Sequence, residues 1–231
     1  MDFKQIGKAL RIDVFKILAY SNGSVWLLVL LPLVFAVVPG MMGKESVLYP
    51  MSGAVTGMLT FVSAMAGMSV FSYEDQTGSA KLNGLLPVSR RNQVVGRYAF
   101  ALLVVVVAVV LQMICGMMMF RLRRMGAVAG LMTTVLVASP ILAGIYLPIG
   151  YRFPATKAVG YAIILLFVIG GALVLVAFTV PDAVLNNVMD FVTSAKLGPI
   201  PWVAIIGILV AAVIFVLSCR LSMHIYERKE L

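Results

Sequence analysis

The amino-acid sequence predicts an all-α polytopic membrane protein, with six transmembrane helices in a single domain over residues 1–231. Of these residues 62% are hydrophobic and 12% are charged, whereas soluble domains carry about 45–50% apolar and about 25% charged residues. The apolar residues also fall in long charge-free stretches without the period-two alternation of membrane β-strands. Because crossing a hydrocarbon core of about 30 Å takes about 20 helical residues, these stretches predict membrane-spanning helices.

Each span is placed where an apolar stretch is long enough to cross the bilayer. The predicted spans cover residues 24–43, 51–73, 98–120, 126–148, 158–180 and 200–219. Residues 1–23 precede them, and their apolar side chains recur at helical spacing, as in Phe3, Ile6, Leu10 and Val14. This pattern predicts an amphipathic helix in the membrane interface. The alternative is an extension of the first span.

The distribution of Lys and Arg between the loops predicts the orientation. If both termini are cytoplasmic, 13 of the 18 Lys and Arg residues lie on the cytoplasmic side. The outer side then holds only Lys44, Arg121, Arg123, Arg124 and Lys196. We therefore expect cytoplasmic termini, with the basic side facing anionic headgroups.

The three outer arginines, Arg121, Arg123 and Arg124, go against this distribution. Their side chains can reach outward to headgroups, or they can form a basic patch for an anionic ligand or partner. A misplaced span is the third explanation.

The sequence offers no set of residues for catalysis or for ion coupling within the membrane. The predicted spans contain no charged residue, whereas ion-coupled transporters place ionisable side chains there. Cys115 and Cys219 fall inside spans, and His224 has no companion ligand, so we expect no metal and no cofactor. The chain also lacks the GxxxxGK[ST] phosphate-binding loop. We expect no enzyme here, and any energy for transport must come from a partner protein.

The segment 74–97 between the second and third spans is the place where such a partner would act. It starts with acidic residues and continues as a short apolar helix that Pro87 ends, after which Ser89 can cap a helix leading into the third span. The sequence Leu-Pro-Val-Ser-Arg at 86–90, followed by Gly-Arg-Tyr at 96–98, resembles the permeases of type-2 ATP-binding cassette (ABC) transporters.

The resemblance extends over most of the chain. Residues 1–23 resemble that family's connecting helix, and residues 78–86 resemble its coupling helix. The sequence Tyr-Arg-Phe-Pro-Ala-Thr-Lys at 151–157 resembles the signature of a branch of small bacterial permeases that includes peptide exporters and peptide-immunity systems.

The resemblance implies an exporter permease in the bacterial cytoplasmic membrane. Two copies, or one copy and a sister chain, would enclose the path for a hydrophobic or amphipathic peptide, lipid or drug. It implies coupling to a separate ATPase through Glu74, Leu82, Leu85, Leu86, Pro87, Ser89 and Arg90. A second inner loop would contribute Arg152 and Lys157.

Two other functions remain open. One is a membrane subunit that binds the substrate of a vitamin or metal uptake system, and the other is a membrane scaffold that transports nothing. A neighbouring reading frame for an ATPase favours the exporter, whereas a vitamin bound to the purified chain favours the uptake subunit.

Overall fold

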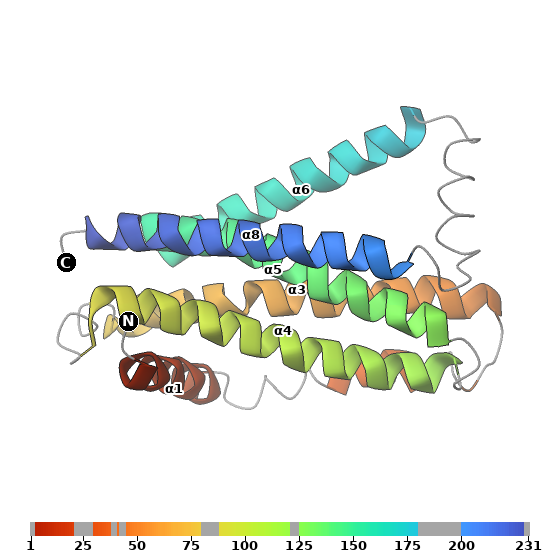
Figure 1. Cartoon of the computed structure of the whole chain (residues 1–231), viewed down its shortest axis with the longest axis horizontal. Coiled ribbons are helices and arrows are strands. Elements are labelled where there is room, and N and C mark those ends of the chain that lie inside the picture. The colour runs from red at the N-terminus through yellow and green to blue at the C-terminus, as the bar shows by residue number, and fades with distance from the viewer. Residues whose placement is uncertain are drawn as a thin grey trace.

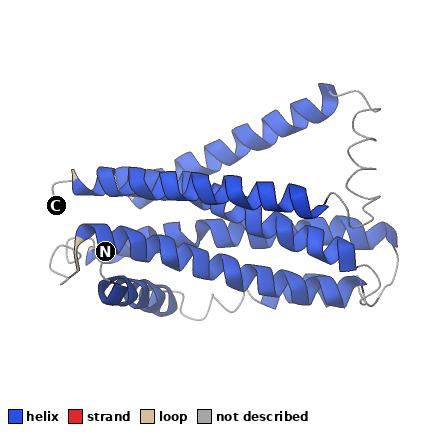
Figure 2. Cartoon of the chain, viewed as in Figure 1, coloured by secondary structure: helices blue, strands red, loops and turns tan. Residues whose placement is uncertain are grey.

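The computed structural model describes residues 3–20, 30–37, 41, 45–79, 88–120, 125–179 and 200–228, and the regular structure in these ranges is helical (Figure 2). The principal helices are α1 (Phe3–Tyr20), α3 (Glu45–Thr77), α4 (Arg90–Phe120), α5 (Met125–Arg152), α6 (Ala155–Thr179) and α8 (Ile200–Glu227). Residues 30–37 are helical as well. The all-α class is thus confirmed for the described part of the chain.

Helices α3, α4, α5 and α8 form a bundle in which α4 runs antiparallel to the other three helices (Figure 1). Helix α5 is central, because it packs against α3, α4, α6 and α8. Helix α6 starts against the bundle and diverges from it along its length, while α1 lies across α4 and α3 (Figure 1).

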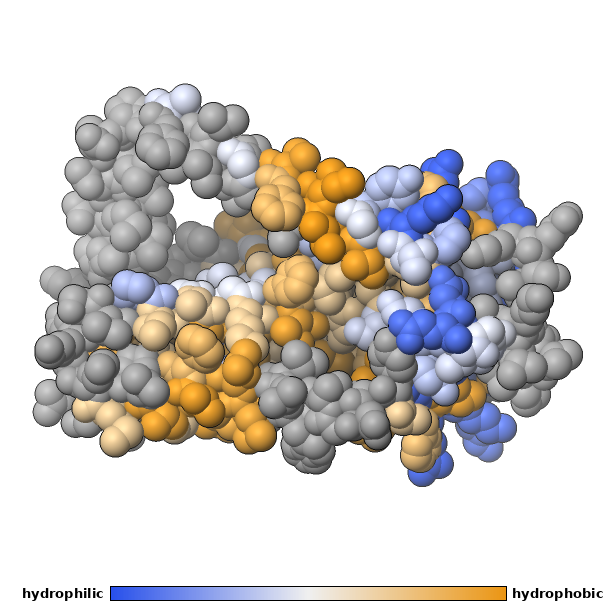
Figure 3. All heavy atoms as spheres, turned by 180° about the vertical axis from the view of Figure 1, so that it is seen from behind, coloured by the Kyte–Doolittle hydropathy of each residue, from blue (hydrophilic) through white to orange (hydrophobic). Residues whose placement is uncertain are grey.

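Both termini lie at the same end of the bundle, together with the last turns of α3, α5 and α8 and the first turns of α4 and α6 (Figure 1). Every Lys and Arg of the described ranges lies on α1, in the two turns of a helix nearest this end, or directly after α8, and hydrophilic residues gather at this end in Figure 3. We call it the basic end and the opposite one the far end.

Four helices are long and apolar enough to cross a membrane within the residues whose side chains are also described. They are Pro50–Thr77, Arg90–Phe120, Met125–Arg152 and Ala204–Glu227. These helices coincide with the second, third, fourth and sixth predicted spans. Large apolar side chains are exposed on α4, α6 and α8, which suits a surface that faces lipid and is rare on soluble monomers.

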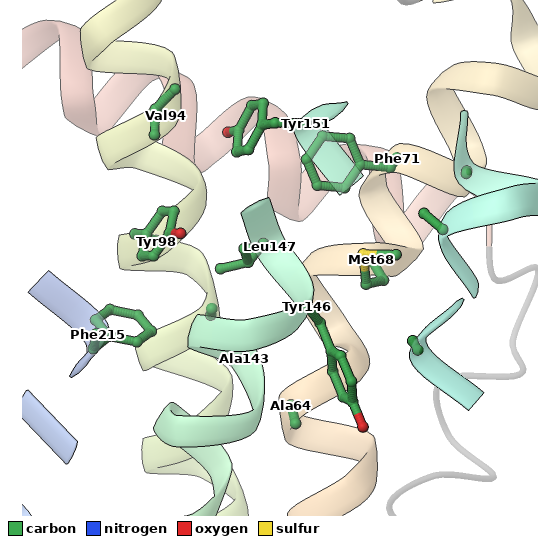
Figure 4. Packing of buried hydrophobic residues seen from close by; sticks show 14 of the residues in the cluster. Ala64, Met68, Phe71, Val94, Tyr98, Ala143, Tyr146, Leu147, Tyr151 and Phe215 are labelled. Atoms are coloured by element: carbon green, nitrogen blue, oxygen red, sulfur yellow. The ribbon is translucent and has the colours of Figure 1, made fainter. Parts of the chain in front are cut away.

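The core at the basic end is rich in aromatic side chains (Figure 4). Phe71, Tyr98, Tyr146, Tyr151 and Phe215 are buried there with smaller apolar residues. The rings of Tyr98 and Phe215 meet edge to face, with centroids 4.9 Å apart, an arrangement that aromatic quadrupoles favour. A second apolar cluster fills the bundle towards the far end.

A proline inside α5 is compensated by a hydroxyl group from α8. Pro148 has no N–H group, so the carbonyl of Gly144, four residues earlier, lacks its helical donor. The Ser218 hydroxyl donates a hydrogen bond to that carbonyl at 2.5 Å. Tyr98 Oη lies 2.6 Å from Ser218 Oγ and 2.7 Å from Ser222 Oγ. One polar chain therefore connects α4, α5 and α8.

Polar side chains are also buried at mid-bundle. Ser63 Oγ of α3 donates a hydrogen bond to Ser139 Oγ of α5 at 2.8 Å. Gln112 of α4 is 0% exposed, and neither its Nε2 nor its Oε1 atom has a hydrogen-bond partner in the described part of the chain. Since buried polar groups are normally paired, Gln112 is an exception within this bundle.

Candidate functional site

A buried arginine organises the basic end. Arg97 lies in the second turn of α4, and only 7% of its surface is exposed. Its guanidinium group contacts Glu74 of α3, which is 4% exposed. Arg97 Nη2 lies 2.5 Å from Glu74 Oε1 and Nη1 lies 3.3 Å from Oε2. Both oxygens of the carboxylate therefore meet the guanidinium in the two-pronged geometry that arginine favours.

Helix α1 contributes a second carboxylate and a second cation. Asp13 is 4% exposed, and its Oδ2 and Oδ1 atoms lie 3.4 Å and 3.5 Å from Nε and Nη2 of Arg97. Lys16 Nζ lies 2.7 Å from Glu74 Oε1. We call Asp13, Lys16, Glu74 and Arg97 the Arg97 network. It balances two positive charges with two negative ones, as buried charges require.

The sequence of α1 and a glycine of α4 bring this network together. Ala9, Asp13 and Lys16 share one face of α1 because they are spaced by four and three residues. A Cβ atom at Gly96 would lie 2.5 Å from the Cβ of Ala9. Only glycine at position 96 therefore allows α1 to lie this close to α4, which places Asp13 beside Arg97.

Aromatic rings from α3 and α5 cover the guanidinium. The Cζ atom of Arg97 lies 4.3 Å from the ring centroid of Phe71 and 5.7 Å from that of Tyr151. The two rings meet edge to face at 4.8 Å, side by side in Figure 4. A Cβ at Gly150 would lie 2.7 Å from the Phe71 ring. Cation–π attraction thus adds α5 to the elements held by Arg97.

Helix α6 is attached to α3 by an adjacent carboxylate. The backbone N–H of Ala155, in the first turn of α6, donates a hydrogen bond to Asp75 Oδ2 at 2.5 Å. A carboxylate at a helix N-terminus pairs an otherwise free donor and complements the helix dipole. Of the second inner loop, Arg152 lies over the Phe153 ring at 5.6 Å, and Lys157 is exposed in the first turn of α6.

The start of α4 is capped as the sequence predicts. Ser89 Oγ accepts a hydrogen bond from the Asn92 backbone N–H at 3.4 Å, which is the geometry of a serine N-cap. Gln5 Oε1 of α1 accepts hydrogen bonds from Ser89 N at 3.3 Å and Asn92 Nδ2 at 2.8 Å. Arg90 lies over the ring of Tyr226, 6.0 Å from its centroid.

The predicted coupling residues are thus only partly placed. Three of them lie at the basic end. Glu74 is in α3, Arg90 is the first residue of α4, and Ser89 directly precedes Arg90. The remaining predicted positions, Leu82, Leu85, Leu86, Pro87, Arg121, Arg123 and Arg124, lie outside the described residues.

Three members of the Arg97 network were missed as site residues by the sequence reasoning. Arg97 was part of the Gly-Arg-Tyr pattern, and Asp13 and Lys16 were part of the amphipathic helix. The spacing of Ala9, Asp13 and Lys16 was the available signal for a polar buried face on α1.

The arrangement is suited to holding helices together rather than to chemistry. In the described ranges no group of three or more His, Cys, Asp or Glu side chains is placed to bind a metal ion. The carboxylates of the Arg97 network are occupied by cations. Ion pairs join α1, α3 and α4, ring contacts add α5, and the Asp75 contact adds α6. The basic end is therefore a set of helix termini fixed to one another.

The comparison with protein families agrees with this architecture. The sequence model of a family described as "ABC-2 family transporter protein" matches residues 14–227 of this chain. This range contains Lys16, Glu74 and Arg97. A search for curated relatives finds no match. Since the family model covers most of the 231 residues, the resemblance found in the sequence is confirmed. The chain belongs to the ABC-2 transporter family, as a multi-pass membrane permease component of an ABC transporter, which implies association with an ABC ATPase subunit.

Proposed function

We propose that this permease is the membrane-spanning subunit of an ATP-driven exporter, and that its ATPase docks on the segment 74–97. The single observation that carries the proposal is the Arg97 network. Glu74 stands one turn before the end of α3, and Arg97 stands two turns into α4. Their ion pair joins the two helices that flank residues 78–89.

Through this network, a force applied to residues 78–89 would be transmitted to the transmembrane helices. A soluble partner that pushes on residues 78–89 displaces α3 and α4 together, because Arg97 holds their ends in contact. Asp13 and Lys16 pass the displacement to α1, and the Phe71–Tyr151 contact passes it to α5. Packed helices transmit such displacements because their interiors are dense and resist compression.

The geometry supports six spans with both termini in the cytoplasm. Helix α1 lies at the basic end and α3 begins at the far end (Figure 1), and the first predicted span, residues 24–43, falls between these two helices in the sequence. Helix α6 leaves the basic end with 25 residues, about 37 Å at 1.5 Å per residue, which is long enough for a fifth span. The gathering at the basic end of the Lys and Arg residues that the structure describes supports its cytoplasmic location, in a bacterial cytoplasmic membrane.

A second permease, identical or a sister chain, would complete the path. Export follows from the resemblance to small peptide-exporting permeases. A hydrophobic or amphipathic peptide, lipid or drug suits the exposed apolar surfaces of α4, α6 and α8.

The test is co-expression with an ABC ATPase from a neighbouring reading frame, followed by purification and reconstitution into vesicles. We expect a stable complex of two permeases and two ATPases whose ATP hydrolysis rises with one class of peptide or lipid. A permease that purifies with a bound vitamin and without ATPase would contradict the proposal and favour the uptake subunit. A complex without ATP-dependent transport of any cargo would favour the scaffold.

A further inference from the structure

A basic groove lies between three helices at the basic end, beside the Arg97 network. It has a volume of about 640 Å³, within the range of about 300–1,000 Å³ typical of ligand sites. The groove is lined by side chains from all three helices: Gln5 of α1, Arg91 and Asn92 of α4, and Arg220, His224 and Glu227 of α8.

The groove has an excess of positive charge. The Arg91 guanidinium pairs with the Glu227 carboxylate, which leaves Arg220 without an ion-pair partner in the described part of the chain. His224 lies one turn beyond Arg220 and adds a further hydrogen-bond donor. The groove is therefore suited to an anion.

An apolar stripe leads into the groove along the same face of α8. Val213, Leu217, Arg220 and His224 are spaced by four, three and four residues, so they lie on one side of the helix. Val213 is 57% exposed and Leu217 is 59% exposed. A ligand that fits this face combines a long apolar part with an anionic head.

The depth of the groove in the membrane supports the same ligand. The sixth predicted span ends at residue 219, so Arg220 stands where the hydrocarbon core meets the headgroups. Each headgroup layer is about 5–7 Å thick, and the four residues from Arg220 to His224 rise about 6 Å along the helix. The basic side chains thus cover the headgroup layer, and the Val213–Leu217 stripe lies in the hydrocarbon.

We propose that this groove binds the phosphate of an anionic phospholipid in the cytoplasmic leaflet, whose acyl chain lies on the Val213–Leu217 stripe. The Arg220 guanidinium meets the phosphate oxygens with two N–H groups, as arginine does at phosphates. Basic pockets between transmembrane helices are suited to such lipids. A soluble ATPase cannot follow the stripe into the bilayer, which favours a lipid over a protein at this place.

The bound lipid would contact α1, α4 and α8 together. Because it binds the folded bundle only, it would stabilise the protein increasingly as its concentration rises. This role goes beyond the proposed export function and depends only on the basic end facing the cytoplasm.

The experiment uses the purified full-length permease in a neutral detergent. Dioleoylphosphatidylglycerol, dioleoylphosphatidylcholine or inorganic phosphate is added, and both thermal unfolding and lipid retention in native mass spectrometry are recorded. We expect phosphatidylglycerol alone to raise the unfolding temperature and to remain bound. Arg220→Gln should weaken its apparent affinity by at least tenfold, because the phosphate loses its arginine. Arg11→Gln is the matched control, since Arg11 is an exposed arginine of α1 at the same end but outside the groove, and this variant should bind as the wild type does.

Three results would overturn the proposal. Equal weakening by Arg11→Gln means that lipid binds by net charge alone, and an equal response to inorganic phosphate means that no lipid is required. The third is an Arg220→Gln variant that keeps its lipid affinity but, when co-expressed with the ATPase, no longer co-purifies with it. This result would make the groove a protein-docking surface. Circular dichroism of Arg220→Gln should match the wild type, because the substituted side chain is exposed.

Discussion

The replacement Arg97→Met tests the Arg97 network most sharply. Methionine keeps most of the apolar length of the side chain and removes its charge. Glu74 retains Lys16, whose Nζ atom lies 2.7 Å from Oε1. Asp13 loses the guanidinium that contacts both of its oxygens and remains a buried carboxylate. We therefore expect the loss of stability to arise mainly where α1 packs against α4.

The expected destabilisation is large because the pair is shielded from water. The side chains of Arg97 and Asp13 are 8% and 6% exposed, so solvent screens their interaction only weakly. Removing one partner of a buried ion pair costs about 3–5 kcal/mol. For a chain of this length each kcal/mol lowers the unfolding temperature by about 2–4 °C. We therefore expect a decrease on the order of 10 °C.

Thermal unfolding of the purified permease in detergent measures this decrease. Adding Asp13→Asn to Arg97→Met removes the uncompensated charge and should restore part of the stability, which a general packing defect would not allow. Arg91→Met is the matched control, because its ion pair with Glu227 is exposed, and it should unfold as the wild type does. An unfolding temperature of Arg97→Met within about 1 °C of the wild type, well below the expected decrease, would refute the reasoning, as would a double variant less stable than Arg97→Met.

Three further predictions concern the bundle and its orientation. Gln112→Met should raise the unfolding free energy by about 1–3 kcal/mol, because it removes a buried amide that has no partner in the described ranges; a lower unfolding temperature would reveal a partner for Gln112. Ser218→Ala should cost about 1–2 kcal/mol in the same assay, because the Gly144 carbonyl loses its donor. Its control is Thr134→Ala, an exposed hydroxyl bonded within its own helix, and equal destabilisation in both would refute the role of Ser218. In cells, on a background without Cys115 and Cys219, a cysteine at position 196 should react with an impermeant reagent, and one at position 152 should react only after permeabilisation. The reverse pattern would invert the topology.

The positions of the spans could be predicted because the membrane imposes a simple rule on the sequence. Charge-free stretches of about 20 residues mark the helices, and α3, α4, α5 and α8 lie where this rule placed them. The ends of the helices were less accessible. Helix α3 runs on through Glu74 to Thr77, beyond the predicted end of its span at residue 73, whereas α4 begins at Arg90, directly after the predicted cap Ser89. Charged residues continue a helix as readily as apolar ones where it leaves the hydrocarbon core.

The Arg97 network could not be predicted because its members are far apart in the sequence. Arg97 and Asp13 are separated by 84 residues. Taken singly, Arg97 is one more cytoplasmic basic residue and Asp13 one polar residue of an amphipathic helix. Their contact depends on the place where α1 crosses α4, which the Gly96–Ala9 approach determines. Likewise, Pro148 predicts an unpaired carbonyl at Gly144, but the sequence does not indicate that Ser218 pairs with it.

The most direct test of the central claim changes the proposed docking segment and leaves the membrane core intact. In the sequence, Leu85 and Leu86 fall between α3 and α4. If they dock in a groove of the ATPase as proposed, withdrawing each leucine side chain from that groove costs about 1.5–3 kcal/mol. Because about 1.4 kcal/mol is a tenfold change in affinity, Leu85→Asp combined with Leu86→Asp should weaken ATPase binding by at least about a hundredfold. Arg121→Gln, predicted on the opposite side of the membrane, is the control and should keep the ATPase. The account predicts that the double variant inserts, dimerises and purifies without its ATPase. A double variant that retains the ATPase at wild-type affinity and transports normally would contradict it.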